Sequence, residues 1–470
     1  MLAFRLGTYS TLIHLPRERR LNLLALASLI FFTTSGGAFG LEPLVGAVGP
    51  GWAVVLIAVT PLVWSLPAAL MAAELTALMP EEGGYYVWIR EAFGPFCAVQ
   101  QAWWMMTISV VWMAMSPVLF VSYLTSFVSS IAYFVDVTNI ASLAIFRWLL
   151  AVLFIVCGVV LNLRGTRKVG GSAKIGAYVV LASFALLVSV WLKVGPAPTI
   201  VDFVRRDPTS GHEGALLLGL SYIIYNTSGW ENASTYAGEV DDPRRNYPRA
   251  LAAALLVMIL CYLLPVIAGV SITSDPAVWN SDAGWPVIAQ RIGGRWLRTL
   301  LAATGVVSAT GLFNASLLYV SRLPLVLARD RWLPQVFANL SRGTAVPAMA
   351  IIVFGAITAF FAAFSFGSLA VIQCVFYAAS MTFEFLALLV LRHRYPSAHR
   401  RFRVPGGWLG LAYVCLTPLG FVAVVLVAIL RDLRSFYGQF LVVGLVFASG
   451  AALYFIRRGF ALERQNRVKS

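Results

Sequence analysis

Charged residues are scarce in this sequence. Asp, Glu, Lys and Arg make up 12% of its 470 residues, about half of the share found in a typical soluble domain. Hydrophobic residues make up 60%, and the mean hydropathy is +0.82. Because a membrane-spanning helix needs roughly 20 apolar residues, this composition excludes a cytosolic enzyme and predicts about a dozen membrane spans.

Acidic residues are scarcer than basic ones. The chain has 20 Asp and Glu against 35 Lys and Arg, which gives a net charge of +15. In a soluble protein this excess would suggest nucleic-acid binding, but the cytosolic loops of membrane proteins collect basic residues. We therefore expect a lipid bilayer around the protein and no nucleic-acid partner.

The residue groupings of common catalytic sites are also missing. The five cysteines lie singly inside apolar stretches, which argues against a disulfide framework. The four histidines lie outside the predicted spans or at their ends, and no G-x-x-x-x-G-K-S/T nucleotide loop occurs. We therefore predict that the chain is not an enzyme and uses no metal or cofactor. Because no nucleotide-binding loop occurs, an ion gradient or exchange would have to supply the energy for any transport that the chain performs.

The sequence does contain a series of apolar, almost charge-free runs. They predict twelve spans, at 22–47, 52–79, 98–128, 142–163, 170–193, 214–239, 250–272, 297–322, 346–364, 367–391, 408–430 and 435–456. With the N-terminus inside, 26 of the 35 Lys and Arg fall on cytosolic segments, so both termini are predicted to be cytosolic. The resulting parts are a cytosolic N-terminus (1–21), a first unit of five spans (22–193), a second unit of five (214–391), two further spans (408–456) and a cytosolic tail (457–470).

Two of the predicted spans carry nearly the same interruption. Residues 34–37 (TSGG) lie in the first span and residues 227–230 (TSGW) in the sixth, and a glutamate follows each. Small residues can simply allow close helix packing. However, backbone groups at membrane depth must be satisfied, and a matched pair five spans apart is typical of an inverted-repeat secondary transporter with its site at the midplane.

Several motifs resemble one superfamily of transporters. Segments that look like signatures of the amino acid–polyamine–organocation transporters occur at 162–165 (NLRG), 229–250 (GW to NYPRA), 321–334 (SRLP to RWLP) and 401–405 (RFRVP). Finer matches to the plant- and protozoan-type polyamine uptake transporters, whose relatives are the L-type amino acid permeases, occur at 35–42, 64–67, 73–75, 80–85 and 100–103. The resemblance implies an all-α integral membrane protein with 12 transmembrane helices. These would form a 5+5 inverted repeat with broken helices 1 and 6, plus two extra helices.

Four acids fall within the predicted spans, and a charged side chain there costs at least ~2.5 kcal/mol, which makes each a functional candidate. Glu231 directly follows the second interruption, and Glu42 follows the first by about two turns. Either carboxylate would favour the ammonium group of a cationic substrate. Glu74, near the cytosolic end of span two, is predicted to act at an inner gate or to anchor a loop. Glu384 is predicted either to reach the cavity or to pair with a neighbour.

Aromatic residues and one lysine complete the predicted site. The resemblance gives Tyr225 the position of a gating aromatic, and aromatic rings attract cations. Some proton-coupled relatives carry a lysine beside the first break; Lys174 lies about one turn earlier, so snorkelling to the cytosolic surface is the competing explanation. The predicted substrate-binding residues are Ser35, Gly36, Gly37, Glu42, Trp112, Tyr225, Ser228, Gly229, Trp230, Glu231, Tyr377 and Glu384. The predicted gating or coupling residues are Glu74, Lys174, Tyr225 and Glu231.

The sequence therefore predicts a secondary active transporter of the plasma membrane that imports amino acids or polyamines by proton symport. Glu231 is the first candidate for carrying the proton, because burial favours the protonated form of a carboxyl. The plant-type pattern has acids where this chain has Pro43, Ala68 and Trp112, which leaves a short diamine or an amino acid open as the substrate. A neutral amino acid permease or exchanger of the same fold is the alternative, and a channel is the rival class.

Overall fold

The computed structural model describes residues 20–131, 144–196, 199, 215–281, 283–363, 366–398, 400–432 and 437–469. Over these residues the secondary structure is helical, apart from one isolated bridge between Leu21 and Val240. Nine helices in the described part of the chain are long and apolar enough to cross a membrane. The prediction of an all-α membrane protein is confirmed, whereas the count of twelve crossings stays a prediction.

The first half begins with an interrupted helix, whose two parts are α1 (Leu23–Thr34) and α2 (Glu42–Val48). The next crossing is a rod of three consecutive segments: α3 (Pro50–Thr60), the π-helical turn η2 (Pro61–Ser65) and α4 (Leu66–Leu78). It is followed by α5 (Tyr85–Phe93), α6 (Pro95–Ile131), α8 (Ala144–Leu163) and α9 (Thr166–Val194).

The second half begins with another interrupted element, α11 (Ala215–Thr227) followed by the 3-10 helix η3 (Asn232–Glu239). After it come α12 (Pro243–Ile272), α13 (Pro276–Trp279), α14 (Gly284–Gly293), α15 (Arg295–Val320), α16 (Arg322–Arg329) and η4 (Gln335–Ala338). The last helices are α17 (Ala348–Phe361), α18 (Phe366–Arg394), α19 (Gly407–Asp432) and α20 (Tyr437–Lys469).

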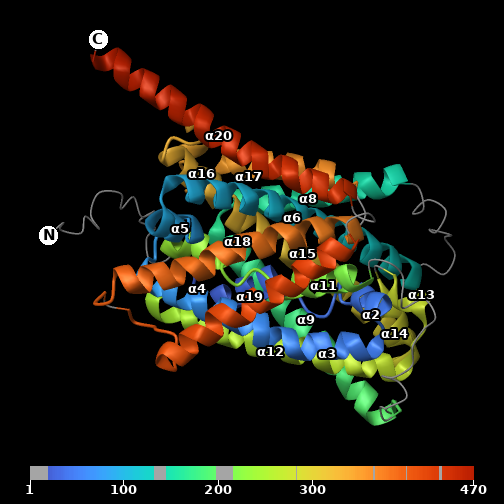
Figure 1. Cartoon of the computed structure of the whole chain (residues 1–470). Helices are drawn as coiled ribbons and strands as arrows, with labels where there is room; N and C mark the ends of the chain where they lie inside the picture. Colours follow the sequence, from blue (N-terminus) through green and yellow to red (C-terminus); the bar gives the residue numbers. More distant parts are fainter. Residues whose placement is uncertain are drawn as a thin grey trace.

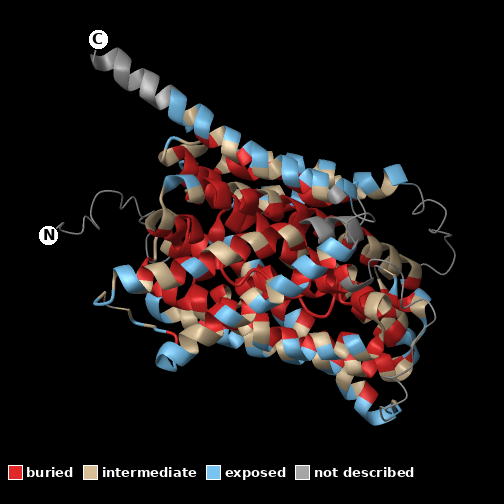
Figure 2. Cartoon of the chain, in the orientation of Figure 1, coloured by how far each residue is buried: buried red, intermediate tan, exposed pale blue. Residues whose placement is uncertain are grey.

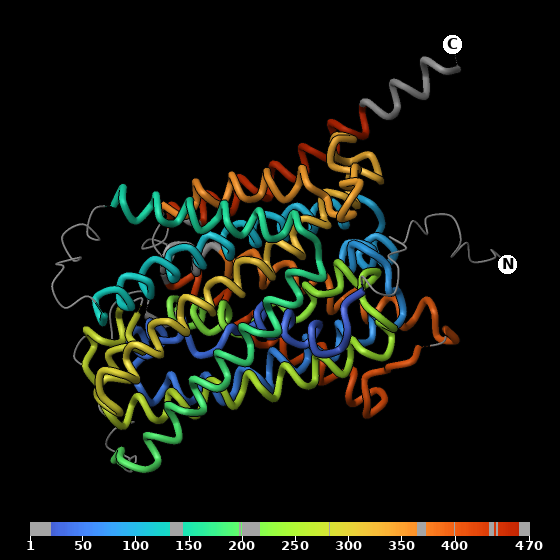
Figure 3. Tube along the Cα trace, turned by 180° about the vertical axis from the view of Figure 1, so that it is seen from behind, coloured from blue at the N-terminus to red at the C-terminus, as the bar shows by residue number. Residues whose placement is uncertain are grey.

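The long helices run in roughly the same direction, which both views of the chain show (Figures 1 and 3). The short helices α5 and α16 lie at one end of the bundle, and α13 and α14 lie at the other (Figure 1). We refer to these as the α5 end and the α14 end. Buried residues fill the middle of the bundle, and exposed residues lie on its periphery (Figure 2).

Burial separates central from peripheral helices. In α6, 83% of the most apolar window is buried, whereas in α20 the share is 17%. Because lipid contacts apolar side chains as readily as the protein interior does, the exposed faces of peripheral helices such as α20 suit a bilayer. The buried α6 is therefore the helix best placed to line an internal site.

The π-helical turn η2 interrupts the regular ladder of the second crossing. Pro61 opens it and has no N–H to donate, and π-turns inside helices frequently occur at functional sites. The turn carries Ser65, whose hydroxyl donates to the Thr227 carbonyl at the end of α11 (3.2 Å). The irregular part of the second crossing therefore lies against the second interrupted helix.

Several helices extend beyond the predicted spans. Helix α12, which corresponds to the seventh predicted span, begins at Pro243 instead of residue 250. Helix α20 continues to Lys469, through the residues of the predicted tail. The tail is therefore not a separate unit of secondary structure. The boundary between the predicted spans nine and ten, at 364–367, includes Phe364 and Ser365, which lie outside the described residues.

Candidate functional site

The first break is built on glycines. Gly36 and Gly37 have φ values of +67° and +95°, in the left-handed region that favours glycine. A Cβ on Gly37 would lie 2.6 Å from a methyl group of Val180 in α9, and one on Gly36 would lie 2.9 Å from the Ser308 hydroxyl in α15. The first break therefore packs directly against α9 and α15.

The carbonyl groups of the first break accept hydrogen bonds from the protein's own side chains. The donors are Ser308 to the Gly36 carbonyl, Trp285 to the Ala38 carbonyl (2.8 Å) and Asn226 to the Gly40 carbonyl (3.0 Å). The Gly37 N–H donates to the Ser35 hydroxyl (3.1 Å). Trp285 belongs to α14, so the α14 end of the molecule closes over this break.

Glu42 is held by hydrogen bonds next to the first break. It is fully buried at the start of α2, where a carboxylate complements the helix dipole. One oxygen accepts the Gly40 N–H (2.8 Å), and the other accepts the hydroxyl of Tyr123 from α6. Each Glu42 oxygen therefore has a hydrogen-bond partner within the protein, and its role in substrate binding stays a prediction.

The second break meets the first at Gly229. This glycine has φ of +99°, and a Cβ there would lie 2.3 Å from the Thr33 carbonyl oxygen at the end of α1. Its N–H donates to the hydroxyl of Tyr377 in α18 (2.7 Å). The Trp230 indole donates to the Thr227 carbonyl (2.8 Å), so Trp230 is part of the turn itself.

Two buried carboxylates lie next to the second break. Tyr377 donates its hydroxyl proton to Glu231 (2.7 Å) and accepts from Gly229, which links the break to α18. Glu384, two turns further along α18, accepts a hydrogen bond from Gln101 of α6 (2.9 Å). Gln101 also donates to Ser380 (3.0 Å). Helices α6 and α18 and the second break thus converge on one acidic cluster.

Each of these carboxylates keeps one oxygen without a partner. Among the described residues, Oε1 of Glu231 and Oε2 of Glu384 are buried and accept no hydrogen bond. The hydroxyl of Ser228 is also buried and has no hydrogen-bond partner there. The two carboxylates are close enough to interact electrostatically. Buried polar atoms are usually hydrogen-bonded, so these atoms mark a place where a cation or a donor would be stabilised.

Aromatic rings surround this acidic cluster. Trp112 and Tyr225 pack with ring centroids 5.4 Å apart, and Trp64 lies 5.9 Å from Tyr377. A Cβ on Gly229 would lie 3.2 Å from the Trp112 ring, so Trp112 covers the turn of the second break. Tyr85 of α5 interacts electrostatically with both carboxylates. The predicted pocket walls Trp112 and Tyr377 and the predicted gate Tyr225 all lie at the second break.

Ion pairs close the α5 end of the bundle. The segment after η3 pairs with the chain before α1, through hydrogen bonds from the Leu21 N–H to Glu239 and from the Asp241 N–H to Leu21 (both 2.9 Å). The Glu239 carboxylate forms a buried ion pair with Arg322 of α16 (2.9 Å). Several closed contacts therefore lie between the second break and this end of the bundle.

Glu82 belongs to the same closed end. It pairs with Arg329 (3.1 Å) and is 4% exposed. Burial and the nearby Glu239 charge raise the pKa of Glu82 to about 7, against the opposing effect of Arg329 and Arg322. This carboxyl therefore changes its charge near neutral pH, outside the membrane-spanning segments.

The other two predicted gating or coupling residues lie away from the acidic cluster. Glu74 accepts from Arg392 (2.8 Å) and from the Val404 N–H (2.7 Å), so it holds the segment between α18 and α19. Lys174 is half-buried on α9. The α9 residue that contacts Gly37 is Val180, about 9 Å further along the helix. The structure thus does not bring Lys174 to the first break.

Sequence reasoning missed Gln101, Ser380, Tyr85 and Tyr123 as site residues. Gln101 was visible only as an amide in a long apolar run, and its partner lies 283 residues away in the sequence. The spacing of 377, 380 and 384 places three polar side chains on one face of α18. That spacing could have indicated an internal face, because a helix face toward lipid is expected to carry apolar side chains.

The helices and the site together define a multi-pass membrane transporter. A profile of the amino acid permease family matches residues 21–448. Among similar proteins, one named a polyamine transporter from Arabidopsis thaliana is 32% identical over 412 residues, covering 87% of this chain and 80% of its own. A rice protein with the same kind of name is 34% identical over 418 residues, covering 87% and 74%.

A more distant relative carries a different name. The human cystine/glutamate transporter is 25% identical over 419 residues, covering 83% of this chain and 77% of its own. The match of the family profile over nearly the whole chain, together with relatives above 30% identity, shows the family. This chain belongs to the amino acid permease family, in the amino acid–polyamine–organocation superfamily. The predicted superfamily is confirmed.

Proposed function

We propose that this protein is a secondary active transporter that imports a cationic amine, a polyamine or a cationic amino acid, across the plasma membrane by proton symport. The observation that carries the proposal is the pair of buried carboxylates, Glu231 and Glu384, each with one oxygen that has no partner among the described residues. The relatives named polyamine transporters support the same substrate class.

Charge complementarity is the reason to favour a cation. Two carboxylates buried near each other are costly unless a positive charge or protons compensate them. A diamine would place one ammonium group at each carboxylate, with the rings of Tyr377 and Trp112 beside its alkyl chain. The carboxylate of an amino acid would need a hydrogen-bond donor at the second break, but the Gly229 N–H already donates to Tyr377.

The proposed topology has twelve crossings with both termini in the cytosol. The nine long helices, the two interrupted pairs α1–α2 and α11–η3, and α17 would supply them. Spans one to five and six to ten would form the two halves of an inverted repeat, with the interrupted helices in corresponding positions. The α5 end would then face the cytosol.

The proposed transport step is a switch in which end of the bundle is open. Tyr225 would close the path from the α14 end, and the Glu239–Arg322 and Glu82–Arg329 pairs would open toward the cytosol. Glu231 would carry the coupled proton, because burial favours the protonated form of a carboxyl.

Uptake into proteoliposomes tests the proposal. Labelled putrescine, spermidine, arginine, leucine and serine would be compared in vesicles with an imposed inward proton gradient. We expect the cationic amines to accumulate and a protonophore to collapse that accumulation. Preferential uptake of leucine or serine would instead indicate a neutral amino acid permease.

Two further outcomes separate the rival mechanisms. Accumulation that needs a substrate inside the vesicle and ignores the proton gradient would indicate an exchanger. Unitary conductance in planar bilayers, without counterflow, would indicate a channel. Thermal stabilisation of the purified protein by the same five compounds provides an independent ranking of their affinities.

A further inference from the structure

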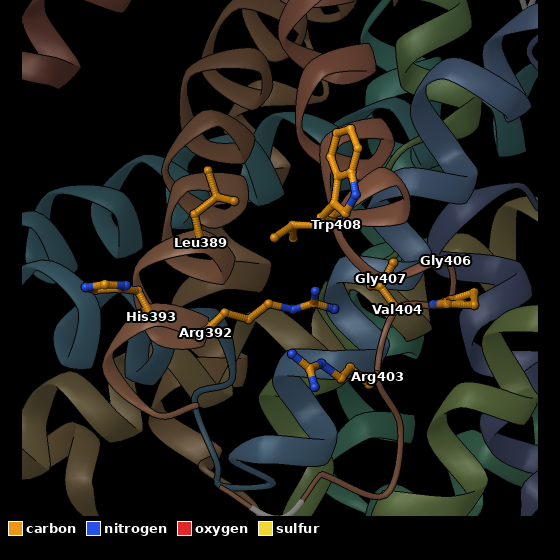
Figure 4. Close-up of a pocket in the computed structure, with 10 residues that line it drawn as sticks. Leu389, Arg392, His393, Arg403, Val404, Gly406, Gly407 and Trp408 are labelled. Carbon is orange, nitrogen blue, oxygen red and sulfur yellow. The ribbon is translucent and has the colours of Figure 1, made fainter. Parts of the chain in front are cut away.

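A pocket of about 590 Å³ lies at the α5 end of α18, beyond Glu384 along the helix. Its walls come from the last turns of α18, the connecting segment and the first turn of α19 (Figure 4). Its lining includes Leu389, Arg392, Arg403, Val404, Gly407 and Trp408. The pocket therefore combines cationic and apolar walls at the junction of two long apolar helices.

Positive charge is in excess at this pocket. The Glu74 carboxylate beneath it is shared by Arg392 (2.8 Å) and by Arg400, whose nitrogen lies 3.7 Å away. Arg403 acts on Arg400 as a like charge. In the described part of the chain, the exposed Arg403 has neither a hydrogen bond nor an ion pair. Two guanidinium groups thus share one carboxylate, and a third, that of Arg403, lies near them and is available to a ligand.

The pocket also has the features of a membrane boundary. Trp408 is 76% exposed and Leu409 is 62% exposed at the start of α19. Tryptophan is enriched at the level of the lipid headgroups. The N-terminus of the 26-residue α19 opens onto the pocket through Gly407 and Trp408, and the dipole of a helix favours negative charge at that end.

We propose that this pocket binds the phosphate of an anionic phospholipid from the adjoining membrane leaflet. Arg403 and Arg392 would hold the phosphate oxygens by charge-assisted hydrogen bonds. The apolar wall formed by Leu389, Leu411 and Trp408 would contact the start of the acyl chains. Basic pockets between membrane helices are suited to anionic headgroups. A soluble phosphate would use the cations and leave that apolar wall unused.

The ligand would also touch the contacts that hold two crossings together. Arg392 ties α18 to Glu74 of α4, and the Val404 N–H donates to the same carboxylate. A phosphate beside Arg392 would offset the excess positive charge around Glu74. Lipid binding would therefore stabilise the junction of α4, α18 and α19, and the unfolding temperature would rise with it.

Native mass spectrometry of the full-length protein titrated with phosphatidylglycerol tests the inference. We expect Arg403→Gln to weaken binding about fivefold, since one basic residue near an anionic surface contributes ~1 kcal/mol. Arg403→Lys keeps the charge and should retain most of the affinity. The matched control Arg342→Gln removes an exposed arginine from another loop at the same end, and its affinity should equal that of the wild type.

Trp408→Ala is the second variant, and it should weaken binding while leaving the pocket's charge intact. Wild-type affinity in both Arg403→Gln and Trp408→Ala would overturn the inference. Equal affinity of the wild type for phosphatidylcholine would also overturn it, because the charge would then be irrelevant. In nanodiscs of phosphatidylcholine alone, stabilisation by inorganic phosphate that matches the effect of phosphatidylglycerol would show that the ligand is a soluble phosphate and not a lipid.

Discussion

The two helix breaks look alike in sequence but differ in how their polar groups are satisfied. At the first break, the side chains of Ser308, Trp285 and Asn226 donate hydrogen bonds to the backbone carbonyls. Both carboxylate oxygens of Glu42 also accept hydrogen bonds from the protein. At the second break, the buried oxygen of Glu231 and the hydroxyl of Ser228 have no partner within the described residues. In our proposal the first break therefore supports the site, whereas the second offers the groups that bind the cation.

This difference shows that a break in a membrane helix is not by itself a binding site. Each break removes backbone hydrogen bonds that something must replace. Side chains of neighbouring helices replace some of them at both breaks; at the second break Ser65 donates to the Thr227 carbonyl and Tyr247 donates to the Trp230 carbonyl. Where buried acceptors are left over, as at Glu231 and Glu384, the protein retains polar groups that a substrate can satisfy.

The largest expected effect comes from filling the contact between the two breaks. Gly229→Ala places a Cβ against the Thr33 carbonyl in a left-handed backbone, and strain plus overpacking should cost about 3 kcal/mol or more of folding free energy. Gly37→Ala should cost less, because its neighbour is a methyl group of Val180 that can shift. The thermal unfolding of each variant measures the cost.

Gly49→Ala is the control for backbone strain alone. Gly49 also has a positive φ, of +81°, but nothing lies within 4 Å of its added Cβ. Its ψ of 164° places it in a region essentially restricted to glycine, so we expect a cost of about 1–3 kcal/mol. If Gly229→Ala were no worse than Gly49→Ala, the two breaks would not pack as closely as the structure places them.

Exchanging each glutamate for glutamine tests the comparison directly. Glu231→Gln should reduce uptake of putrescine, spermidine and arginine about a hundredfold, since it removes a buried charge that would pair with the cation. Glu42→Gln makes the same change at the first break and should leave the preference for cations over leucine unchanged. Uptake per folded molecule in proteoliposomes measures both. A selective loss in Glu42→Gln, with normal transport in Glu231→Gln, would reverse the roles of the two breaks.

The hydroxyl that links the second break to α18 should have an intermediate effect. Tyr377→Phe removes the acceptor of the Gly229 N–H and the donor to Glu231. A hydrogen bond to a charged group contributes about 1.5 kcal/mol, so uptake of cationic amines should fall about tenfold. Tyr395→Phe removes a hydroxyl that donates to Glu91 at the α5 end. Its uptake should remain near the wild-type rate, and an equal loss in both would point to a general packing defect.

The smallest expected effect concerns the pH dependence of stability that Glu82 produces at the closed α5 end. The pKa of Glu82 is raised from its usual 4.5 to about 7, so between these two pH values the folded protein binds more protons here than the unfolded chain does. Stability contributed by this group is therefore present at low pH and is lost as pH rises through about 7. Glu82→Gln should remove this component, and the unfolding temperature of the wild type relative to the variant should fall as pH rises. Curves that stay parallel from pH 6 to pH 8 would contradict this.

Much of the local structure could be predicted from the sequence. Apolar runs predicted the helices, and the two TSG motifs predicted where α1 and α11 end, because glycine and short polar residues weaken a helix wherever they occur. Membrane depth also made the buried acids stand out. These inferences needed only neighbouring residues and the length of a bilayer crossing.

The partners of those acids could not be predicted in the same way. Glu42 resembled Glu231, yet Tyr123 and Gly40 satisfy it, while Tyr377 leaves Glu231 with a free oxygen. The contact between Gln101 and Glu384 joins residues 283 positions apart. Hydrogen bonds of this kind depend on how α6 and α18 pack against each other, and the periodicity of either helix carries no information about that packing.

The sequence by itself determined the membrane class, the helical spans, the two breaks and the presence of acids near them, because burial in lipid and backbone propensity act locally. Only the tertiary structure decided which break leaves buried polar atoms without a partner among the described residues, that Glu384 lies near Glu231, and that Glu74 ties α4 to the segment before α19. The reason is that a side chain's electrostatic role is set by its neighbours in space, and here those neighbours come from helices distant in the chain.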